Sequence, residues 1–158
     1  MRKTIDINFI KDQNYLMISE FNIAVSDDEI DLLKHKIELT RWPDEINNKW
    51  SHGTDLNFLK SFCHTWQNEF DWRKHENKIN ETGSFRFTSN SGLKIHFLHS
   101  KSNTNNSLPI VMTQGWPGSV QEFIKIIPML HKAAPMPIDI ICPSLPGFGF
   151  SDKPTEPG

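Results

Sequence analysis

The sequence predicts an α/β fold in which only part of a sheet is present. Two helical patterns are followed by a hairpin and then by a strand–helix–strand unit over residues 108–142. Two strands joined by a helix imply parallel pairing through a right-handed crossover. Because a parallel sheet needs helices on both faces, these few elements leave the sheet poorly covered. The apolar fraction of 37% also indicates an incomplete core, so we expect half a domain to be missing.

The first helix is predicted from its start signal. Residues 1–20 have no clear pattern and are expected to be frayed, and residues 21–25 are expected to form a short strand or an extended segment. Ser26 and Glu29 have the spacing of a capping box. The helix that follows carries its apolar side chains on one face and is expected to end near Thr40, before Pro43.

A second helix is predicted to begin near Asp55 and to continue, with a break, through Trp72 to Ile79. Apolar side chains recur at spacings of three and four, which predicts an amphipathic helix whose apolar stripe is core. The stripe consists of Leu56, Leu59, Phe62, Trp66 and Phe70.

A β-hairpin is predicted next. Apolar and polar residues alternate over 85–87 and again over 93–97, and the turn sequence Asn90-Ser91-Gly92 lies between them. The polar residues 101–107 predict a surface loop.

The second half of the chain centres on a short buried strand, Ile110–Met112, followed by a tight loop at Gly115–Gly118. Glycine tolerates positive φ and proline fixes φ, so this loop bends sharply. Ser119 and Glu122 predict a second capping box, and Pro128 predicts a kink or early end of that helix. A further strand is expected over 138–142, followed by a Pro/Gly-rich loop.

Composition argues against several functions. The net charge of −2 gives no support for binding nucleic acid or an anionic membrane. No apolar run approaches the roughly 20 residues of a membrane helix, and the N-terminus does not have the pattern of a signal peptide. Cys63 and Cys142 are isolated thiols, which favours a reducing compartment and a cytoplasmic location.

Several chemically capable residues are assigned structural roles. Asp139 lies in a strand and is expected at a sheet edge or a solvent face. His96 and His99 are three apart on a strand and therefore point to opposite faces, so no metal site is predicted. Cys142 is expected to pack in the core. Residues 147–151 match neither a nucleophile-elbow nor a dinucleotide-binding motif.

Six motifs, in order, carry a resemblance to a known family. They are Thr40-Arg-Trp-Pro-Asp-Glu45, Trp66 with Phe70-Asp-Trp-Arg73, Ile95-His-Phe97, Gly115-Trp-Pro-Gly-Ser119, Glu122-Phe-Ile-Lys-Ile-Ile-Pro128 and Pro143-Ser-Leu-Pro-Gly-Phe-Gly-Phe-Ser-Asp152. From about Phe21 to Gly158 the chain resembles the N-terminal part of a microsomal-type epoxide hydrolase, within the α/β-hydrolase superfamily. The resemblance implies an N-terminal helical region over residues 1–82 and the first part of the hydrolase domain over residues 83–158.

The resemblance also implies a chemistry. Members of the family open epoxides to diols without a cofactor: an aspartate forms an ester, a histidine activates water, and two lid tyrosines hold the epoxide oxygen. The Trp116 backbone N–H is matched to one of two oxyanion donors. Gln114, Gly115 and Pro117 of the same loop and Phe148 of the later loop are expected to line the site of a small apolar epoxide.

The chain departs from the family pattern in two ways. Gln114 stands where the family usually has histidine, and Tyr15 is the only tyrosine. The matched motifs include neither nucleophile, base nor lid, so we expect the isolated chain to be inactive. We also expect it to be only marginally stable, because a sheet this small leaves apolar faces uncovered. Three interpretations stay open: a truncated enzyme, a half of a split hydrolase whose partner pairs with an exposed edge at 138–142, and a non-catalytic binding or structural module.

Overall fold

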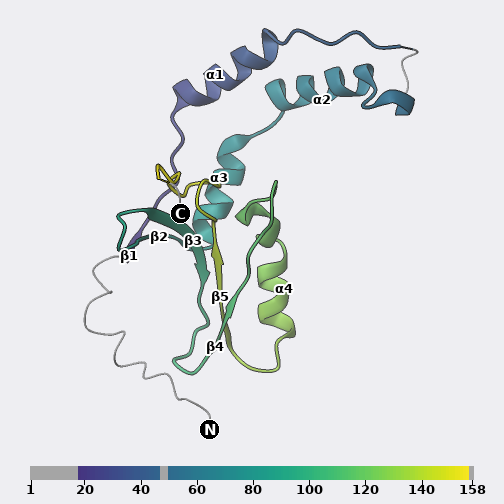
Figure 1. Cartoon of the computed structure of the whole chain (residues 1–158). Helices are drawn as coiled ribbons and strands as arrows, with labels where there is room; N and C mark the ends of the chain where they lie inside the picture. Colours follow the sequence, from purple (N-terminus) through teal and green to yellow (C-terminus); the bar gives the residue numbers. More distant parts are fainter. Residues whose placement is uncertain (1–17, 47–49, 157–158) are drawn as a thin grey trace. The chain divides into compact units, whose positions relative to one another are not determined.

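The computed structural model describes residues 18–46 and 50–156. The described residues form two compact units, one comprising residues 18–23 together with 76–156, and the other residues 24–46 together with 50–75. Figure 1 shows the helices and strands of each unit. The boundary at residue 82 stays a prediction; it falls between a helix that ends at Glu81 and a strand that begins at Ser84, whereas the compact units divide at other positions.

The helical unit begins with α1 (Asp27–Glu38), whose predicted start is confirmed. The Ser26 side chain accepts a hydrogen bond from the Glu29 N–H at 3.2 Å, and the Glu29 carboxylate accepts one from the Ser26 N–H at 3.4 Å. This reciprocal pair satisfies two N–H groups that the first turn leaves free. The helix ends two residues before the predicted position.

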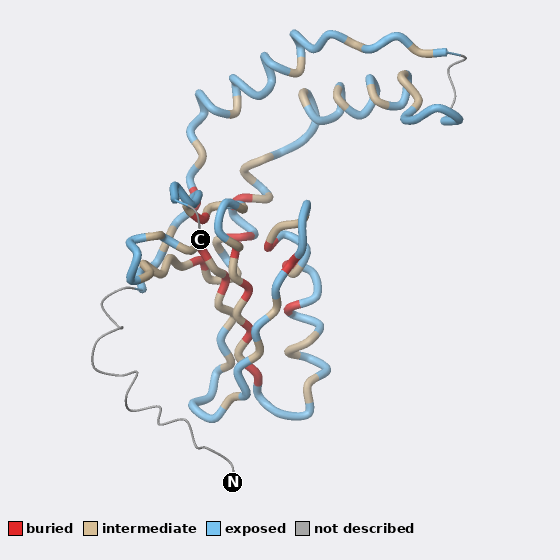
Figure 2. The backbone as a smooth tube through the Cα atoms, in the orientation of Figure 1, coloured by how far each residue is buried: buried red, intermediate tan, exposed pale blue. Residues whose placement is uncertain are grey.

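The second predicted helix is present as α2 (Leu56–Asn68), capped by Asp55, and as α3 (Trp72–Glu81) after the expected break. A short 3₁₀ helix, η3 (Trp50–His52), precedes them. The prediction that the apolar stripe is core is wrong for the described residues, because no residue of α2 is buried. Figure 2 accordingly shows no buried stretch along α2. Phe62 is 56% exposed, and its ring lies 6.3 Å from that of Trp66.

The other unit contains a five-stranded sheet. Its strands are β1 (Ile18–Glu20), β2 (Ser84–Thr88), β3 (Lys94–Ser100), β4 (Leu108–Val111) and β5 (Ile138–Pro143), in the spatial order β1-β2-β3-β5-β4. The expectation of a frayed start is wrong for residues 18–20, which pair with β2, and residues 1–17 lie outside the described part. The predicted strand or extended segment at 21–25 follows β1 without being part of it.

The hairpin and the parallel pair are both confirmed. β2 and β3 are antiparallel, with Phe85 opposite Phe97, and Gly92 takes a φ of 82° in the turn. β4 and β5 are parallel, with Leu108 opposite Ile138.

The position of β5 corrects one prediction. β5 lies between β3 and β4, so the edges of the described sheet are β1 and β4. Residues 138–142 therefore offer no exposed edge, and Asp139 is not at a sheet edge.

The helix predicted after Ser119 is divided into two. A 3₁₀ helix, η4 (Val120–Phe123), is followed by α4 (Ile126–Ala133). The predicted second capping box is absent, because the Ser119 side chain accepts from the Gln121 N–H instead. A continuous helix would press the Pro128 ring against the Ile124 carbonyl. The chain instead restarts at Ile126, which places Pro128 in the first turn of α4, where it is tolerated.

The core lies on one face of the sheet. Strand register places Ser84, His96, Leu98, Ile138, Ile140 and Cys142 on this face, and all six are buried. Figure 1 shows α4 alongside β4 and β5, and Ile127 of that helix is also buried. The opposite face carries half-buried aromatic side chains, among them the stacked rings of Phe85 and Phe97.

Candidate functional site

Two loops share the carboxyl edge of the parallel strands. β4 leads into residues 112–119, and β5 leads into residues 144–152. Because the two strands are parallel neighbours, both loops begin at the same edge of the sheet. Open α/β sheets bind ligands at this edge.

The loop after β4 is closed by a tight turn. The Gly118 N–H donates to the Gly115 carbonyl at 2.7 Å, and the Trp116–Pro117 peptide bond is cis. A Cβ on Gly118 would lie 2.9 Å from the Gly115 carbonyl oxygen, which is closer than side chains tolerate. The turn therefore requires glycine at 118.

Trp116 lies at the tip of this turn. Its side chain is 85% exposed. The last ladder bond of the strand is made by Met112, and within the described part of the chain the Trp116 N–H has no hydrogen-bond partner. This N–H is therefore available to an incoming acceptor, as the predicted oxyanion donor must be. Gly115 and Pro117, its neighbours, are also exposed.

Gln114 lies at the base of the same loop and is 6% exposed. Its side-chain oxygen and nitrogen are both buried, and neither has a partner among the described residues. An unsatisfied buried polar group costs roughly 1–3 kcal/mol. The side-chain amide of Gln114 therefore faces the protein interior in this chain, and the substrate contact expected of Gln114 stays a prediction.

Phe148 lies in the loop after β5 and is half-buried. This loop turns through Gly147 and Gly149, whose φ angles are 82° and 50°. The Phe148 N–H donates to the Leu145 carbonyl and the Ser151 N–H donates to the Phe148 carbonyl, at 2.9 and 3.0 Å. Phe148 is thus held in a hydrogen-bonded turn at the predicted ligand edge.

His96 anchors this loop to β3 through a contact that no local sequence pattern predicts. The imidazole is fully buried, with its two ring nitrogens 2.8 Å from Ser144 Oγ and 3.1 Å from Ser84 Oγ. Burial, reinforced by the nearby Arg86 charge, lowers the pKa of His96 from 6.5 to about 4. His96 is therefore neutral at pH 7, and the interpretation that it is structural rather than a metal ligand agrees with its contacts.

A second polar cluster lies at the opposite end of β5. Asp139 accepts a hydrogen bond from the Ser102 N–H at 2.6 Å, and His99 Nε2 lies 4.0 Å from the other carboxylate oxygen. The Ser102 hydrogen bond lowers the pKa of Asp139, and burial followed by the Lys101 charge lowers the pKa of His99. Because Asp139 lies near the start of β5, this cluster is not part of the carboxyl edge.

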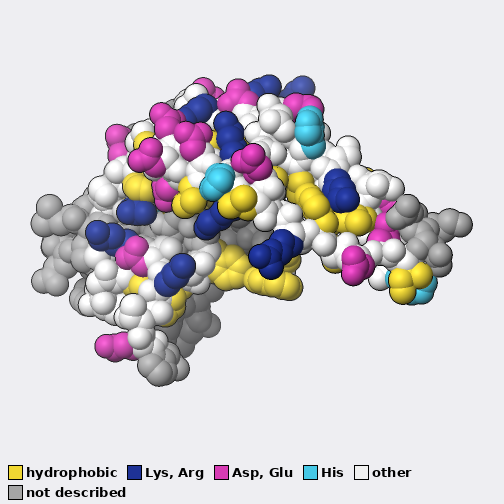
Figure 3. Space-filling view, turned by 90° about the horizontal axis from the view of Figure 1, so that it is seen from above, with side chains coloured by type: hydrophobic (Ala, Val, Ile, Leu, Met, Phe, Trp, Pro, Cys, Tyr) yellow, Lys and Arg dark blue, Asp and Glu magenta, His cyan; other side chains and the backbone are white. Residues whose placement is uncertain are grey.

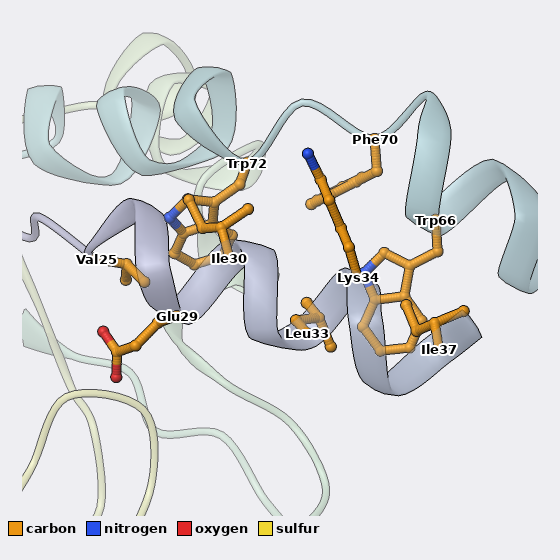
Figure 4. Close-up of a pocket in the computed structure, with 9 residues that line it drawn as sticks. All are labelled: Val25, Glu29, Ile30, Leu33, Lys34, Ile37, Trp66, Phe70 and Trp72. Atoms are coloured by element: carbon orange, nitrogen blue, oxygen red, sulfur yellow. The ribbon is translucent and has the colours of Figure 1, made fainter. Parts of the chain in front are cut away.

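The helical unit contains an apolar groove of about 360 Å³. Ile30, Leu33 and Ile37 of α1 face Trp66, Phe70 and Trp72, and the Lys34 side chain extends beside Phe70 (Figure 4). Glu29 lines the groove but is engaged in the capping box. The space-filling view shows acidic and basic side chains intermixed around visible hydrophobic side chains, without a continuous basic field on that face (Figure 3). The groove supplies apolar surface and no reactive group.

Comparison with known proteins identifies the family. The family model described as "Epoxide hydrolase N terminus" matches residues 18–123. The chain belongs to this epoxide hydrolase family. The chain is 45% identical over 148 residues to a putative epoxide hydrolase of Stigmatella aurantiaca, and 37% identical over 152 residues to epoxide hydrolase 1 of Sus scrofa; each alignment covers 89% of this chain and 33% of the relative.

Solved structures agree with this assignment. The Aspergillus niger epoxide hydrolase superposes with a TM-score of 0.78 at 29% identity, covering 89% of this chain and 38% of that chain. The juvenile hormone epoxide hydrolase of Bombyx mori gives a TM-score of 0.80 at 30% identity, covering 96% and 42%. The predicted α/β-hydrolase fold class and its incompleteness are thereby confirmed.

This epoxide hydrolase N-terminal chain spans about a third of the length of the curated relatives that it matches. Within residues 18–46 and 50–156, no group of three or more metal-ligating side chains is placed to hold an ion. Of the helices in that same part, none combines the length and apolar character that crossing a membrane requires.

Proposed function

We propose that this chain supplies the oxyanion loop and part of the scaffold of an epoxide hydrolase that converts a small apolar epoxide to a diol without a cofactor. The observation that carries the proposal is the free Trp116 N–H at the tip of a closed turn, beyond the carboxyl end of a parallel strand, in a chain that belongs to this family. In the reaction, a carboxylate opens the epoxide and forms an ester. Hydrolysis of that ester develops negative charge on its carbonyl oxygen.

The backbone N–H of Trp116 is proposed to stabilise this developing oxyanion. A donor fixed in advance needs no reorganisation during the reaction, and losing one such donor lowers the rate roughly 100- to 1,000-fold. Phe148 and Pro117 are proposed to contact the apolar part of the substrate, and Gln114 and Gly115 to set the shape of the loop. The two unpaired cysteines, Cys63 and Cys142, support a location in the cytoplasm.

The reacting groups are proposed to come from outside this chain. Within the described residues, Asp139 is the only aspartate located in a strand. It accepts a hydrogen bond from the Ser102 N–H near the start of β5, at the opposite end of the strand from the carboxyl edge that carries the candidate site. The isolated 158-residue chain is therefore expected to give no diol from styrene oxide.

The test is complementation. The chain is mixed with the C-terminal two thirds of the Stigmatella aurantiaca relative, produced as a separate polypeptide, and diol formation is measured. We expect activity from the mixture, a loss of about 100-fold or more for Trp116→Pro, which removes the N–H, and a much smaller change for Trp116→Phe, which retains it. Turnover by the isolated chain that Trp116→Pro abolishes, or equal losses for the two variants, would overturn the proposal.

The open edge of β4 favours one half of a split hydrolase as a second candidate. The Leu108 and Met112 N–H groups bond to β5, so the alternating backbone directs the groups of Pro109 and Val111 away from the described sheet. Val111 is 63% exposed and offers the one N–H of this pair, because proline has none. We expect Val111→Pro to weaken association with the complementing polypeptide and Val111→Thr to preserve it. Equal association of the two variants, measured by gel filtration, would argue against pairing at β4.

A further inference from the structure

The turn that contains Phe148 is hydrogen-bonded to His96. Resting on the proposed function, we propose that His96 is a positioning residue of the substrate site, which fixes residues 144–152 through Ser144 and thereby sets the position of Phe148. His96 itself is buried on β3 and lies outside the reacting groups. Its effect on substrate is exerted through the loop.

The first support is a closed set of hydrogen bonds between His96 and the two ends of the turn. The His96 N–H donates to Ser151 Oγ at 2.9 Å, and the Ser151 hydroxyl donates to the Ser144 carbonyl at 2.7 Å. The Ser144 N–H in turn donates to the His96 carbonyl at 2.8 Å. The backbone of His96 is therefore bonded to both ends of the turn, and Lys94 adds a second contact at the later end, where its carbonyl accepts from the Asp152 N–H at 2.9 Å. The exposed tip between these ends takes its position from them, and the His96 ring adds a side-chain contact at the Ser144 end.

The second support is that the two ring nitrogens of His96 bond to different parts of the structure. Nδ1 is bonded to Ser144 on the loop at 2.8 Å, whereas Nε2 is bonded to Ser84 on β2 at 3.1 Å. A Cβ on Gly149 would lie 3.1 Å from Ser144 Oγ, so the loop also closes tightly over this hydroxyl. One ring nitrogen thus connects to the loop and the other to the sheet, which makes the two roles separable by mutation.

The surroundings keep the ring in one orientation. Phe21 and Phe150 present their rings edge-on to the imidazole, with centroids 5.8 and 5.5 Å away. Arg86 is the charged group that acts on it from β2, and the Arg86 guanidinium donates to the Phe150 carbonyl at 3.0 Å. Among the described residues no carboxylate bonds to the ring, so a neutral imidazole held by two hydroxyls is the arrangement that the site favours.

The experiment compares Ser144→Ala with Ser84→Ala, since each removes one hydroxyl from the same ring. We expect Ser144→Ala to speed amide hydrogen exchange at Phe148 and Ser151 about five- to tenfold in this chain, and Ser84→Ala to change it less than about twofold, although both lower the melting temperature. In the complemented enzyme, Ser144→Ala should raise KM for styrene oxide with a smaller change in kcat. Equal effects of the two variants on exchange would overturn the proposal.

Two substitutions of the histidine give an independent check. Asparagine places an amide near the position of Nδ1 and glutamine near that of Nε2, so we expect His96→Asn to keep the loop protected and His96→Gln to lose that protection. The reverse order would contradict the assigned role of Ser144. If the wild-type chain fails to complement, the proposed function fails, while the exchange measurements on the chain alone still decide whether His96 positions the loop.

Discussion

Acidification is expected to destabilise this chain through His96. The pKa of the buried ring is about 4, against 6.5 when exposed, so between these values the unfolded chain binds the proton that the folded chain excludes. The contribution of His96 to the free energy of unfolding is therefore fully present above pH 6.5, and it is lost as the pH falls through this window. This lowering of the His96 pKa corresponds to a loss of about 3 kcal/mol in the free energy of unfolding once the pH reaches 4. Such a loss is a large part of the stability of a small domain.

The measurement is urea unfolding followed by circular dichroism at pH values between 7.5 and 4, for the wild type and for His96→Asn. The free energy of unfolding should fall more steeply for the wild type, with the difference developing below pH 6.5. His99, whose pKa is also lowered, is present in both proteins and cancels in the comparison. Asp139, with its lowered pKa, loses its contribution only at more acidic pH. Parallel pH profiles for the two proteins would refute the assignment of a buried neutral imidazole.

Three further predictions concern a buried side chain, a helix cap and the reactivity of the two thiols. Ile140→Ala should lower the free energy of unfolding by about 2–4 kcal/mol, because Ile140 is fully buried on β5, which is paired on both sides; a loss below about 1 kcal/mol would contradict that packing. Ser26→Ala should cost about 1 kcal/mol and reduce helical circular dichroism, while Ser26→Asp should retain the cap. The buried Cys142, whose pKa is raised to about 11, should resist a thiol reagent until the chain unfolds, whereas the partly exposed Cys63 should react in the folded state.

Local signals predicted the elements well where the deciding contacts are themselves local. The capping box at Ser26 needs only the four residues 26–29, and the hairpin needs only a glycine able to take positive φ at 92. The same box motif at Ser119 failed. Nine residues later, Pro128 prevents one continuous helix, and the resulting 3₁₀ turn offers the Gln121 N–H to the serine in place of the Glu122 N–H. A motif of four residues therefore predicts a cap only when the helix behind it can continue.

The candidate site was predictable only in part, for a related reason. The residues Gly115–Gly118 predict a tight turn, and the family resemblance assigns the Trp116 N–H within it as a donor. The hydrogen bonds that hold the neighbouring loop could not be predicted from the sequence. They combine a serine of β2, a histidine of β3 and two serines after β5. Each of these residues by itself is typical of a strand or a surface loop. Their meeting depends on β5 pairing with β3, with Leu98 opposite Cys142, which no local pattern specifies.

The placement of β5 also depends on pairing between strands that no local pattern specifies, and it decides which strand forms the edge of the sheet. The split-hydrolase interpretation requires an exposed edge at residues 138–142, and the observed strand order does not provide it there. The connection through η4 and α4 instead returns the chain to the inner side of β4, where β5 pairs with two neighbours. β5 carries four aliphatic or sulfur-containing residues, whereas β4 contains Pro109 and presents Leu108 and Val111 half or more exposed. A proline whose nitrogen faces away from the sheet is tolerated at an edge and would remove a ladder bond inside it. The composition of the two strands thus favours β4 over β5 as the outer strand, and pairing of a further polypeptide is to be sought along β4, beside the loop that carries Trp116.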